Sequence, residues 1–228
     1  MGFSPTKPMI LKLITLCLPW FIRRRVLQSW FGYKIHPTAK IGLAWIFPTH
    51  LAMEQGARID HFNVAVNLDR IELKRKSKVG RGNWITGFSL HSNSKHFKHQ
   101  IDRHPELILE EESAITKNHH LDCTDRITIG RFTTIAGYQS QLLTHSIDVV
   151  NNRQDSAPIS IGEYCFVGTN VVILGGASLP SRSVLGAKSL LNKSFSKEWM
   201  LYGGVPAKAI SEIQNDAQYF TRTDGFVY

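Results

Sequence analysis

The feature that most constrains the fold of this chain is a six-residue period in its second half. From Ile161 the sequence divides into IGEYCF, VGTNVV, ILGGAS, LPSRSV, LGAKSL and LNKSFS. The first position is always aliphatic, and the fifth is small in five of the six units. An α-helix would show a period near 3.6 and a simple strand a period of two. A six-residue period predicts flat strands with inward aliphatic side chains and tight corners, stacked as the coils of a β-solenoid.

The period continues upstream in the same pattern. In-phase apolar residues are Ile35, Ile41, Ile59, Ala65, Ile71, Leu73, Val79, Ile85, Leu109, Ile115, Leu121, Ile129 and Ile135. Two-residue slips fall at the similar sequences DRIEL (69–73) and DRITI (125–129), which indicates a duplication of whole coils. The solenoid is therefore expected to begin near residue 35.

Two segments depart from the period. Residues 91–105 break it and predict a loop extruded from the solenoid, with four histidines: His91, His96, His99 and His104. The repeat ends near Trp199, and GGVPAK (203–208) is followed by a predicted short amphipathic helix over 209–220. We expect an N-terminal apolar and basic segment over 1–34, a β-solenoid domain over 35–210, and a C-terminal helix and tail over 211–228.

Composition narrows the class of protein and of partner. The 228 residues carry 27 Lys and Arg against 18 Asp and Glu, a formal net charge of +9, and 43% are hydrophobic. These values exclude a largely disordered, collagenous or polytopic membrane protein. The charge indicates an anionic partner: a nucleic acid, a phosphorylated cofactor or an acidic membrane face. Cys17, Cys123 and Cys165 form neither a metal clip nor a disulfide framework, which favours a reducing compartment.

The N-terminal stretch 9–22, MILKLITLCLPWFI, is apolar but interrupted by Lys12 and Pro19. It is shorter than the roughly 20 residues that span a bilayer, and its arginines follow the apolar run, unlike those of a secretory signal. Two interpretations stay open for residues 9–30. They predict a segment lying on an anionic membrane surface, or a helix packed on the protein itself or on a neighbouring subunit.

The tandem hexapeptides, GGVPAKAI (203–210) and LLTHSID (142–148) together resemble the hexapeptide-repeat acyltransferases. The resemblance covers about residues 35–210. It implies an all-β, left-handed parallel β-helix, a homotrimer with active sites between neighbouring subunits, and acetyl-CoA or another acyl-CoA as donor. YKIHPTAKIG (33–42), NWITGF (83–88) and TIAGYQSQLLTHSID (134–148) are similar to the branch that modifies surface polysaccharides and their sugar precursors. The expected protein is therefore a cytoplasmic O-acetyltransferase, with a peripheral position at the inner face of the membrane as a further expectation.

The resemblance places the general base at His145. A sugar hydroxyl is a weak nucleophile until it loses its proton, and neutral imidazole can accept that proton near neutral pH. Thr144, Ser146, Asp148 or a backbone carbonyl are the candidates to orient the ring. The sequence shows no Ser-His-Asp elbow or nucleophilic cysteine motif, so direct transfer is expected rather than an acyl-enzyme.

The remaining site predictions are less specific. His119 falls at position five of its hexapeptide, as His145 does, and predicts either an acceptor-binding residue or a structural corner histidine. Asn83, Trp84 and Asp148 are further candidates for the acceptor pocket, with corner packing as the alternative for Asn83 and Trp84. Expected CoA contacts, by their positions in the family, are Gly168, Thr169, Ala187, Lys188, Lys193 and Lys208, with the turn Gly204–Lys208 capping the groove.

Several other functions stay open at this stage. Some left-handed β-helices are zinc-dependent carbonic anhydrases, but the loop histidines lack a matching coil phase, so no metal is expected. The basic run KRKSK (74–78) has no accompanying nucleic-acid-binding motif, so no nucleic acid is expected. A purely structural solenoid remains an alternative. Among acyltransferases, serine or xenobiotic O-acetylation and amino-sugar N-acetylation also remain, because no residue pattern identifies the acceptor.

Overall fold

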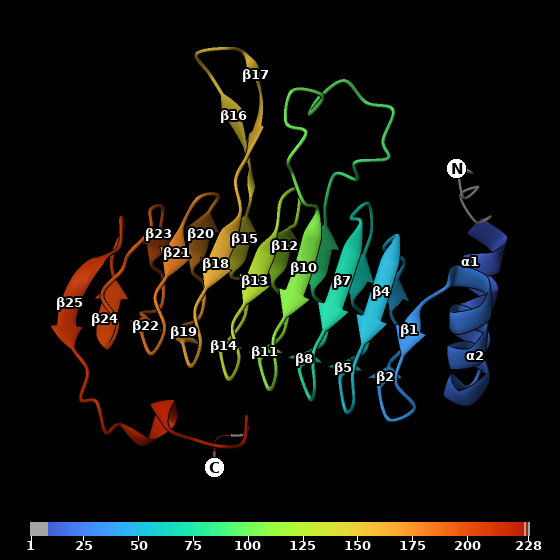
Figure 1. The fold of residues 1–228 in the computed structure, drawn as a ribbon, viewed down its shortest axis with the longest axis horizontal. Coiled ribbons are helices and arrows are strands. Elements are labelled where there is room, and N and C mark those ends of the chain that lie inside the picture. Colours follow the sequence, from blue (N-terminus) through green and yellow to red (C-terminus); the bar gives the residue numbers. More distant parts are fainter. Residues whose placement is uncertain (1–8, 226, 228) are drawn as a thin grey trace.

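The chain winds into a three-sided prism of stacked coils, and successive coils add strands to three parallel sheets (Figure 1). The computed structural model describes residues 9–225 and residue 227. Successive coils pair in parallel on all three faces, as the six-residue period predicts. The expected all-β parallel β-helix is therefore confirmed.

We name the three faces sheets A, B and C. Sheet A contains β1 (Lys34–Ile35), β4 (His50–Met53), β7 (Arg70–Leu73), β10 (Glu106–Leu109), β13 (Ile127–Ile129), β18 (Ile159–Ile161) and β21 (Ser178–Leu179). Sheet B contains β2 (Lys40–Ile41), β5 (Arg58–Ile59), β8 (Lys78–Val79), β11 (Ala114–Ile115), β14 (Thr134–Ile135), β19 (Phe166–Val167), β22 (Val184–Leu185), β24 (Met200–Gly203) and β25 (Lys208–Glu212). Sheet C contains β3 (Trp45–Ile46), β6 (Val64–Ala65), β9 (Trp84–Thr86), β12 (His120–Asp122), β15 (Gln141–Leu143), β20 (Val172–Leu174) and β23 (Leu190–Leu191).

The core is a column of the aliphatic residues that define the repeat. All six first positions from Ile161 to Leu191 are buried, and so are the first five fifth positions, from Cys165 to Ser189. The upstream in-phase residues are buried as well. The two slips have a simple structural cause. β7 and β13 each place two residues inward, Ile71 with Leu73 and Ile127 with Ile129, so these coils are longer on sheet A.

Two helices cover the first coil. α1 (Met9–Cys17) and α2 (Trp20–Phe31) contact each other, and α2 ends at Gly32, whose φ of 71° allows the left-handed conformation of the cap. Leu27 joins the hydrophobic core from α2. The Arg23 guanidinium donates to the carbonyl oxygens of Gly42 and Ala44, both at 2.7 Å. Among the described residues, no helix is long and apolar enough to cross a membrane.

The chain leaves the prism twice, both times at the corner between sheets C and A (Figure 1). The first excursion, between β9 and β10, contains the predicted loop 91–105. The second was not predicted: β16 (His145–Asp148) and β17 (Arg153–Ser156) form an antiparallel hairpin between β15 and β18. His145 therefore begins a hairpin and does not occupy a corner. The buried residue of β15 is Leu142, because the preceding turn is one residue longer than the repeat implies.

The predicted C-terminal helix over 209–220 is mostly wrong. Its first part belongs to β25, which pairs antiparallel with β24, and only η1 (Gln218–Phe220) is helical, as a short 3₁₀ turn. The amphipathic pattern was outweighed by the free edge of β24, whose backbone groups β25 satisfies. Phe220 is buried against Trp199, at 5.3 Å between ring centroids, and ties the tail back to the prism.

Candidate active site

His145 stands where the second excursion leaves the prism. It is the first residue of β16, and its side chain is 36% exposed. The ring has a polar neighbour on each side: its Nδ1 lies 3.6 Å from Asp122 Oδ2, and its Nε2 lies 2.5 Å from Gln154 Oε1 on β17. An exposed imidazole in this position can accept a proton from a bound hydroxyl and release it again.

Asp122 is the functional candidate that the sequence prediction missed. It lies at the end of β12, where Thr124 donates to Oδ1 from its backbone N, at 2.9 Å, and from its Oγ1, at 2.6 Å. These bonds leave Oδ2 directed at His145. Asp122 pairs with Leu143 across sheet C, so it lies on the coil adjacent to the one that leads into His145. Aligning the coils would have shown this juxtaposition.

The residues predicted to orient His145 have other roles. Thr144 is buried, and its Oγ1 donates to the Asp122 carbonyl oxygen at 2.7 Å. Asp148 accepts bonds from Asn151 and Arg153 at the hairpin turn. Hydrogen bonds from Asn151 lower the pKa of Asp148. Asp148 therefore stabilises the turn as a carboxylate.

The first excursion forms a wall beside His145. The ring of Phe97 meets the imidazole edge-on at 5.3 Å, and Arg103 packs over that phenyl ring at 4.4 Å. Gln100 donates to Asp155 Oδ1 at 2.8 Å and exchanges hydrogen bonds with Ser156. The loop and the hairpin are thus fixed to each other. Within residues 9–225 and 227, no group of three or more His, Cys, Asp or Glu side chains is placed to hold a metal ion.

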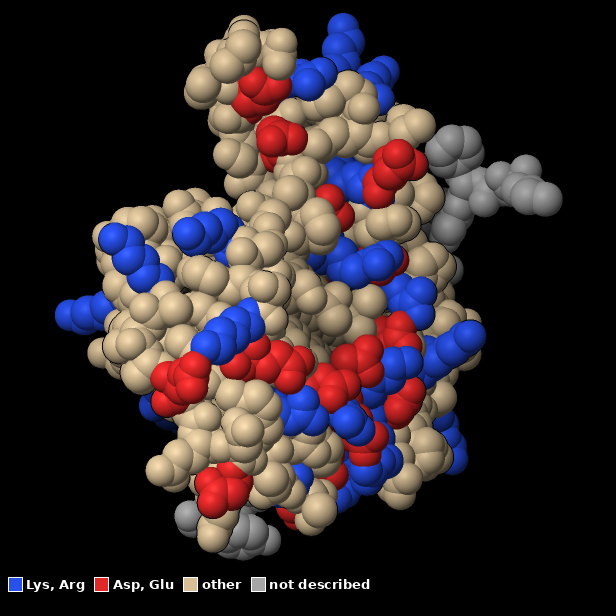
Figure 2. Space-filling view, turned by 60° about the vertical axis from the view of Figure 1, so that its left-hand side comes forward, with Lys and Arg blue, Asp and Glu red and all other residues tan. Residues whose placement is uncertain are grey.

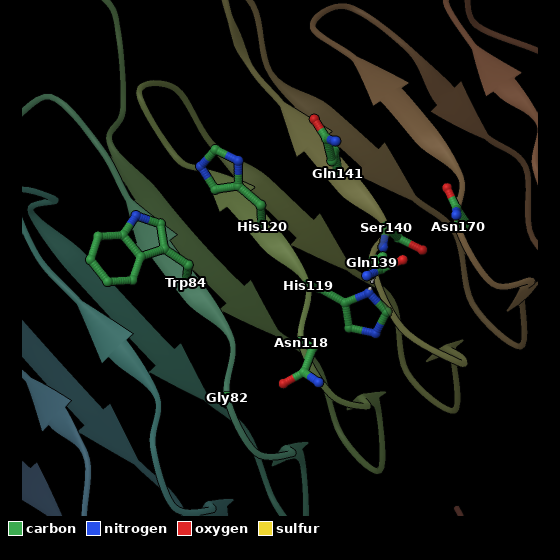
Figure 3. A pocket seen from close by; sticks show the side chains of 9 residues that line it. All are labelled: Gly82, Trp84, Asn118, His119, His120, Gln139, Ser140, Gln141 and Asn170. Carbon is green, nitrogen blue, oxygen red and sulfur yellow. Dashed lines mark hydrogen bonds between the residues drawn. The ribbon is translucent and has the colours of Figure 1, made fainter.

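An open cleft of about 750 Å³ lies on sheet C, on the side toward sheet B (Figure 3). The lining residues are Gly82, Trp84, Asn118, His119, His120, Gln139, Ser140, Gln141 and Asn170. Trp84, His120 and Gln141 are cross-strand neighbours in register on three successive coils. Asp122 is on the same strand as His120, two residues along, so cleft and base share one face of the prism.

His119 and Asn83 are buried under this cleft. His119 is 2% exposed, its Nδ1 accepts from the Ser140 backbone N at 3.1 Å, and its Nε2 lies 2.9 Å from Thr116 Oγ1. Because Nδ1 accepts a bond, the ring proton is on Nε2. Burial lowers the pKa of His119 to about 4. Asn83 Oδ1 accepts from the His119 backbone N at 2.9 Å. Both polar side chains are therefore bonded within the corner.

The predicted donor-binding residues fall into two groups. Gly168, Thr169, Ala187 and Lys188 stack in consecutive coils at the corner between sheets B and C: the Lys188 N donates to Thr169 O at 3.0 Å. A Cβ on Gly168 would approach Ala187 N to 2.6 Å, so the close stacking requires glycine. Lys208 begins β25, and the turn before it contacts the same region, since Gly204 N donates to Ser189 Oγ at 3.1 Å. Lys193 follows β23, on the opposite side of sheet C, toward sheet A.

Comparisons with known proteins give one sequence relative and several structural neighbours. Galactoside O-acetyltransferase of Escherichia coli (strain K12) is 35% identical over 71 residues, which cover 31% of this chain and 34% of the relative. The match thus spans about a third of that relative's length. The N-acyltransferase AntD of Bacillus cereus, solved with dTDP-4-amino-4,6-dideoxyglucose and coenzyme A, superposes with a TM-score of 0.59 at 12% identity. The superposition covers 85% of this chain and 90% of AntD.

The fold is that of the left-handed hexapeptide-repeat β-helices. This confirms the resemblance to the hexapeptide-repeat acyltransferases. A hexapeptide-repeat acetyltransferase of Vibrio cholerae, solved with acetyl coenzyme A, covers 90% of this chain and 85% of its own at 18% identity and a TM-score of 0.47. No family model matches the sequence.

Proposed function

We propose that this protein is an acetyl-CoA-dependent O-acetyltransferase that acts on a sugar hydroxyl of a cell-surface polysaccharide or its precursor. The observation that carries the proposal is the pairing of His145 with Asp122 at the corner between sheets C and A. In the cleft on the same sheet, the half-exposed indole of Trp84 gives a flat apolar surface suited to one face of a sugar ring. The match to a galactoside O-acetyltransferase supports a hydroxyl as the acceptor group. The sugar nucleotide and CoA in the structure of the N-acyltransferase AntD support acyl transfer from CoA to a sugar.

His145 acts as the general base in this reaction. In the structure Nε2 faces an acceptor, the amide oxygen of Gln154. In the proposed reaction the sugar hydroxyl displaces Gln154 and the ring proton lies on Nδ1, facing Asp122. Nε2 then accepts the hydroxyl proton while the sugar oxygen attacks the thioester carbonyl. When the tetrahedral intermediate collapses, the C–S bond breaks and the imidazolium returns the proton to the CoA thiolate. The products are the acetyl ester and free CoA, and the base is regenerated.

The cysteines support direct transfer. Cys123 and Cys165 are buried, and burial raises the pKa of both thiols, that of Cys165 to about 12. Thiols in this state are poor nucleophiles. Cys17 is exposed but lies on α1, away from the cleft on sheet C. An acyl-cysteine intermediate is therefore not part of the proposed route.

The donor is held at the other side of the same face. The backbone stacked around Gly168 and Ala187 allows close approach of the pantetheine arm, and Lys188 and Lys208 supply positive charge for the CoA phosphates. Lys193 lies on the opposite side of sheet C and is not part of this group. The cleft on sheet C is open along its length, so we propose a homotrimer in which a neighbouring prism completes the site. The donor and the three free cysteines fit a cytoplasmic reaction. Residues 9–30, with exposed apolar side chains and arginines, are the proposed region of peripheral membrane contact.

The test is thiol release from acetyl-CoA with purified protein and a panel of nucleotide sugars, oligosaccharides, amino sugars and serine. We expect turnover with a hydroxyl-bearing sugar and a fall of about 10²–10⁴-fold in kcat for His145→Ala. His99→Ala, at an exposed histidine of the first excursion, is the matched control and should retain full activity. Light scattering then measures whether the active species is a trimer.

Each unfavourable outcome has a definite meaning. Turnover only with amino sugars or only with serine would replace the proposed acceptor. An unchanged rate for His145→Ala would remove the proposed base. Absence of both CoA binding and thiol release would contradict acyl transfer and favour a structural solenoid.

A further inference from the structure

The positive charge of this protein is concentrated at the start of the chain. No acidic residue precedes Glu54, so none of the 18 Asp and Glu residues lies in the first 53 positions. Basic residues in that stretch are Lys7, Lys12, Arg23, Arg24, Arg25, Lys34 and Lys40. These seven account for most of the net charge of +9, and the rest of the chain is nearly balanced.

The fold collects the described part of this stretch at one end of the prism. α1 and α2 stand beside β1, at the opposite end from β24 and β25 (Figure 1). They also carry a concentration of exposed large apolar side chains: Met9, Ile10, Leu13, Ile14, Phe21, Ile22 and Trp30. Seven of the 20 such side chains in the described residues are therefore on two short helices. Such a concentration of exposed apolar side chains is typical of an interaction site. We call these two helices the N-terminal cap.

The two sides of α2 differ in their partners. Arg23 and Leu27 face the first coil and are buried, with Arg23 bonded to backbone carbonyls. Phe21, 65% exposed, and Arg25, also exposed, are one turn apart on the opposite side of the helix. The outer surface of the cap thus combines an apolar ring with a guanidinium that points to solvent.

The rest of the prism carries its charge differently. On the face shown in Figure 2, basic and acidic side chains are intermingled. The basic run 74–78 is neutralised locally: Lys74 pairs with Glu72, Arg75 with Glu111, Lys76 with Glu112 and Lys78 with Asp60. Farther along the same face, Arg131 pairs with Glu163 at 2.7 Å. The cap has no acidic residue of its own to do the same.

We propose that the N-terminal cap docks the protein on an anionic lipid bilayer. The exposed apolar side chains of α1 and α2 enter the boundary between headgroups and acyl chains, while Arg24, Arg25 and Lys34 face the lipid phosphates. α1 has nine residues and α2 has 12, so both lie on the surface and neither crosses it. Docking at this end leaves sheet C and both excursions free. The proposal does not rest on acyl transfer.

Co-sedimentation of the full chain with vesicles tests the docking. We expect binding to vesicles that contain phosphatidylglycerol, little binding to pure phosphatidylcholine, and release as salt is raised, because the attraction to lipid charge is screened. Arg24→Gln with Arg25→Gln should weaken binding by about tenfold or more. Phe21→Ser with Ile22→Ser should weaken it further, even at low salt.

Matched controls change the same residue types elsewhere. Lys95→Gln with Lys98→Gln removes two exposed charges from the first excursion, and Val149→Ser with Val150→Ser removes two exposed apolar side chains from the hairpin. Both pairs should sediment like the wild type. Circular dichroism confirms that each variant is folded, and thiol release with a soluble acceptor should be unchanged in the cap variants.

Three results would overturn the proposal. Equal binding to neutral and anionic vesicles would remove its electrostatic part. Cap variants that sediment like the wild type would remove the surface itself. A change of oligomeric mass in the cap variants without lipid, measured by light scattering, would show that the cap contacts a second copy of the chain instead. Absence of thiol release in the wild type and in all variants would contradict the proposed reaction. It would leave the docking proposal unchanged, because vesicle binding is measured separately.

Discussion

Two corners of the same prism use polar residues in opposite ways. At the corner between sheets B and C, Asn63, Asn83, His119 and Ser140 succeed one another in consecutive coils, all buried and bonded to neighbouring coils. At the corner between sheets C and A, the chain leaves the prism twice and presents His145 to solvent. At the first corner, hydrogen bonds between coils replace the hydrogen bonds to water that these polar groups lose on burial. At the second corner the His145 ring is 36% exposed, and we propose that this corner serves chemistry where the first serves stability.

Replacing Asp122 tests the chemical corner and should have the larger effect. Asp122→Asn can keep the bonds from Thr124 but removes the charge beside His145 Nδ1. Losing one charge-assisted contact predicts a fall in kcat of about 10–100-fold, with little change in KM for acetyl-CoA. Steady-state kinetics measures kcat and KM separately, and Asp102→Asn on the exposed loop is the control. If KM rose while kcat stayed constant, Asp122 would bind the donor and would not position the base.

Replacing Asn83 tests the buried corner. Its side chain accepts from the His119 N and donates to Asn63 Oδ1, both within 3.0 Å. Asn83→Ala leaves these partners unsatisfied and should lower the free energy of unfolding by about 1–3 kcal/mol. Asn93→Ala, at an exposed position of the first excursion, should change it by less than about 0.5 kcal/mol. Denaturant unfolding of the two variants measures the difference, and equal costs would contradict the comparison.

His119 gives the buried corner a pH dependence. Burial holds its pKa at about 4 in the folded protein, against 6.5 for an unperturbed imidazole. Between those values the unfolded chain binds a proton that the folded chain does not. Stability is therefore retained above about pH 6.5 and falls as pH drops toward 4, at up to about 1.4 kcal/mol per pH unit. Unfolding curves at several pH values should lose this slope in His119→Gln, and parallel curves for variant and wild type would rule out the assignment.

The sequence predicted the repeating part of the structure well and the interruptions less well. Inward positions such as Ile161 and Leu185 were identified correctly, because each coil buries its side chains against the next in the same register. The loop 91–105 was also identified, since it breaks the period. The hairpin that begins at His145 was missed because its two strands are mostly polar and exposed and show no apolar alternation. The C-terminal strand β25 was missed because a strand edge, which the local pattern does not show, decides its conformation.

By itself, the sequence determined the β-helix and its core, and it singled out the histidine that we propose as the base. Tertiary structure alone decided that Asp122 meets His145, that the first excursion braces the hairpin, and that His119 is a bonded corner residue. The physical reason is that periodicity fixes which side chains point inward in every coil. Contacts between outward side chains depend on the length of each coil. The two two-residue slips and the two excursions change that length along the chain.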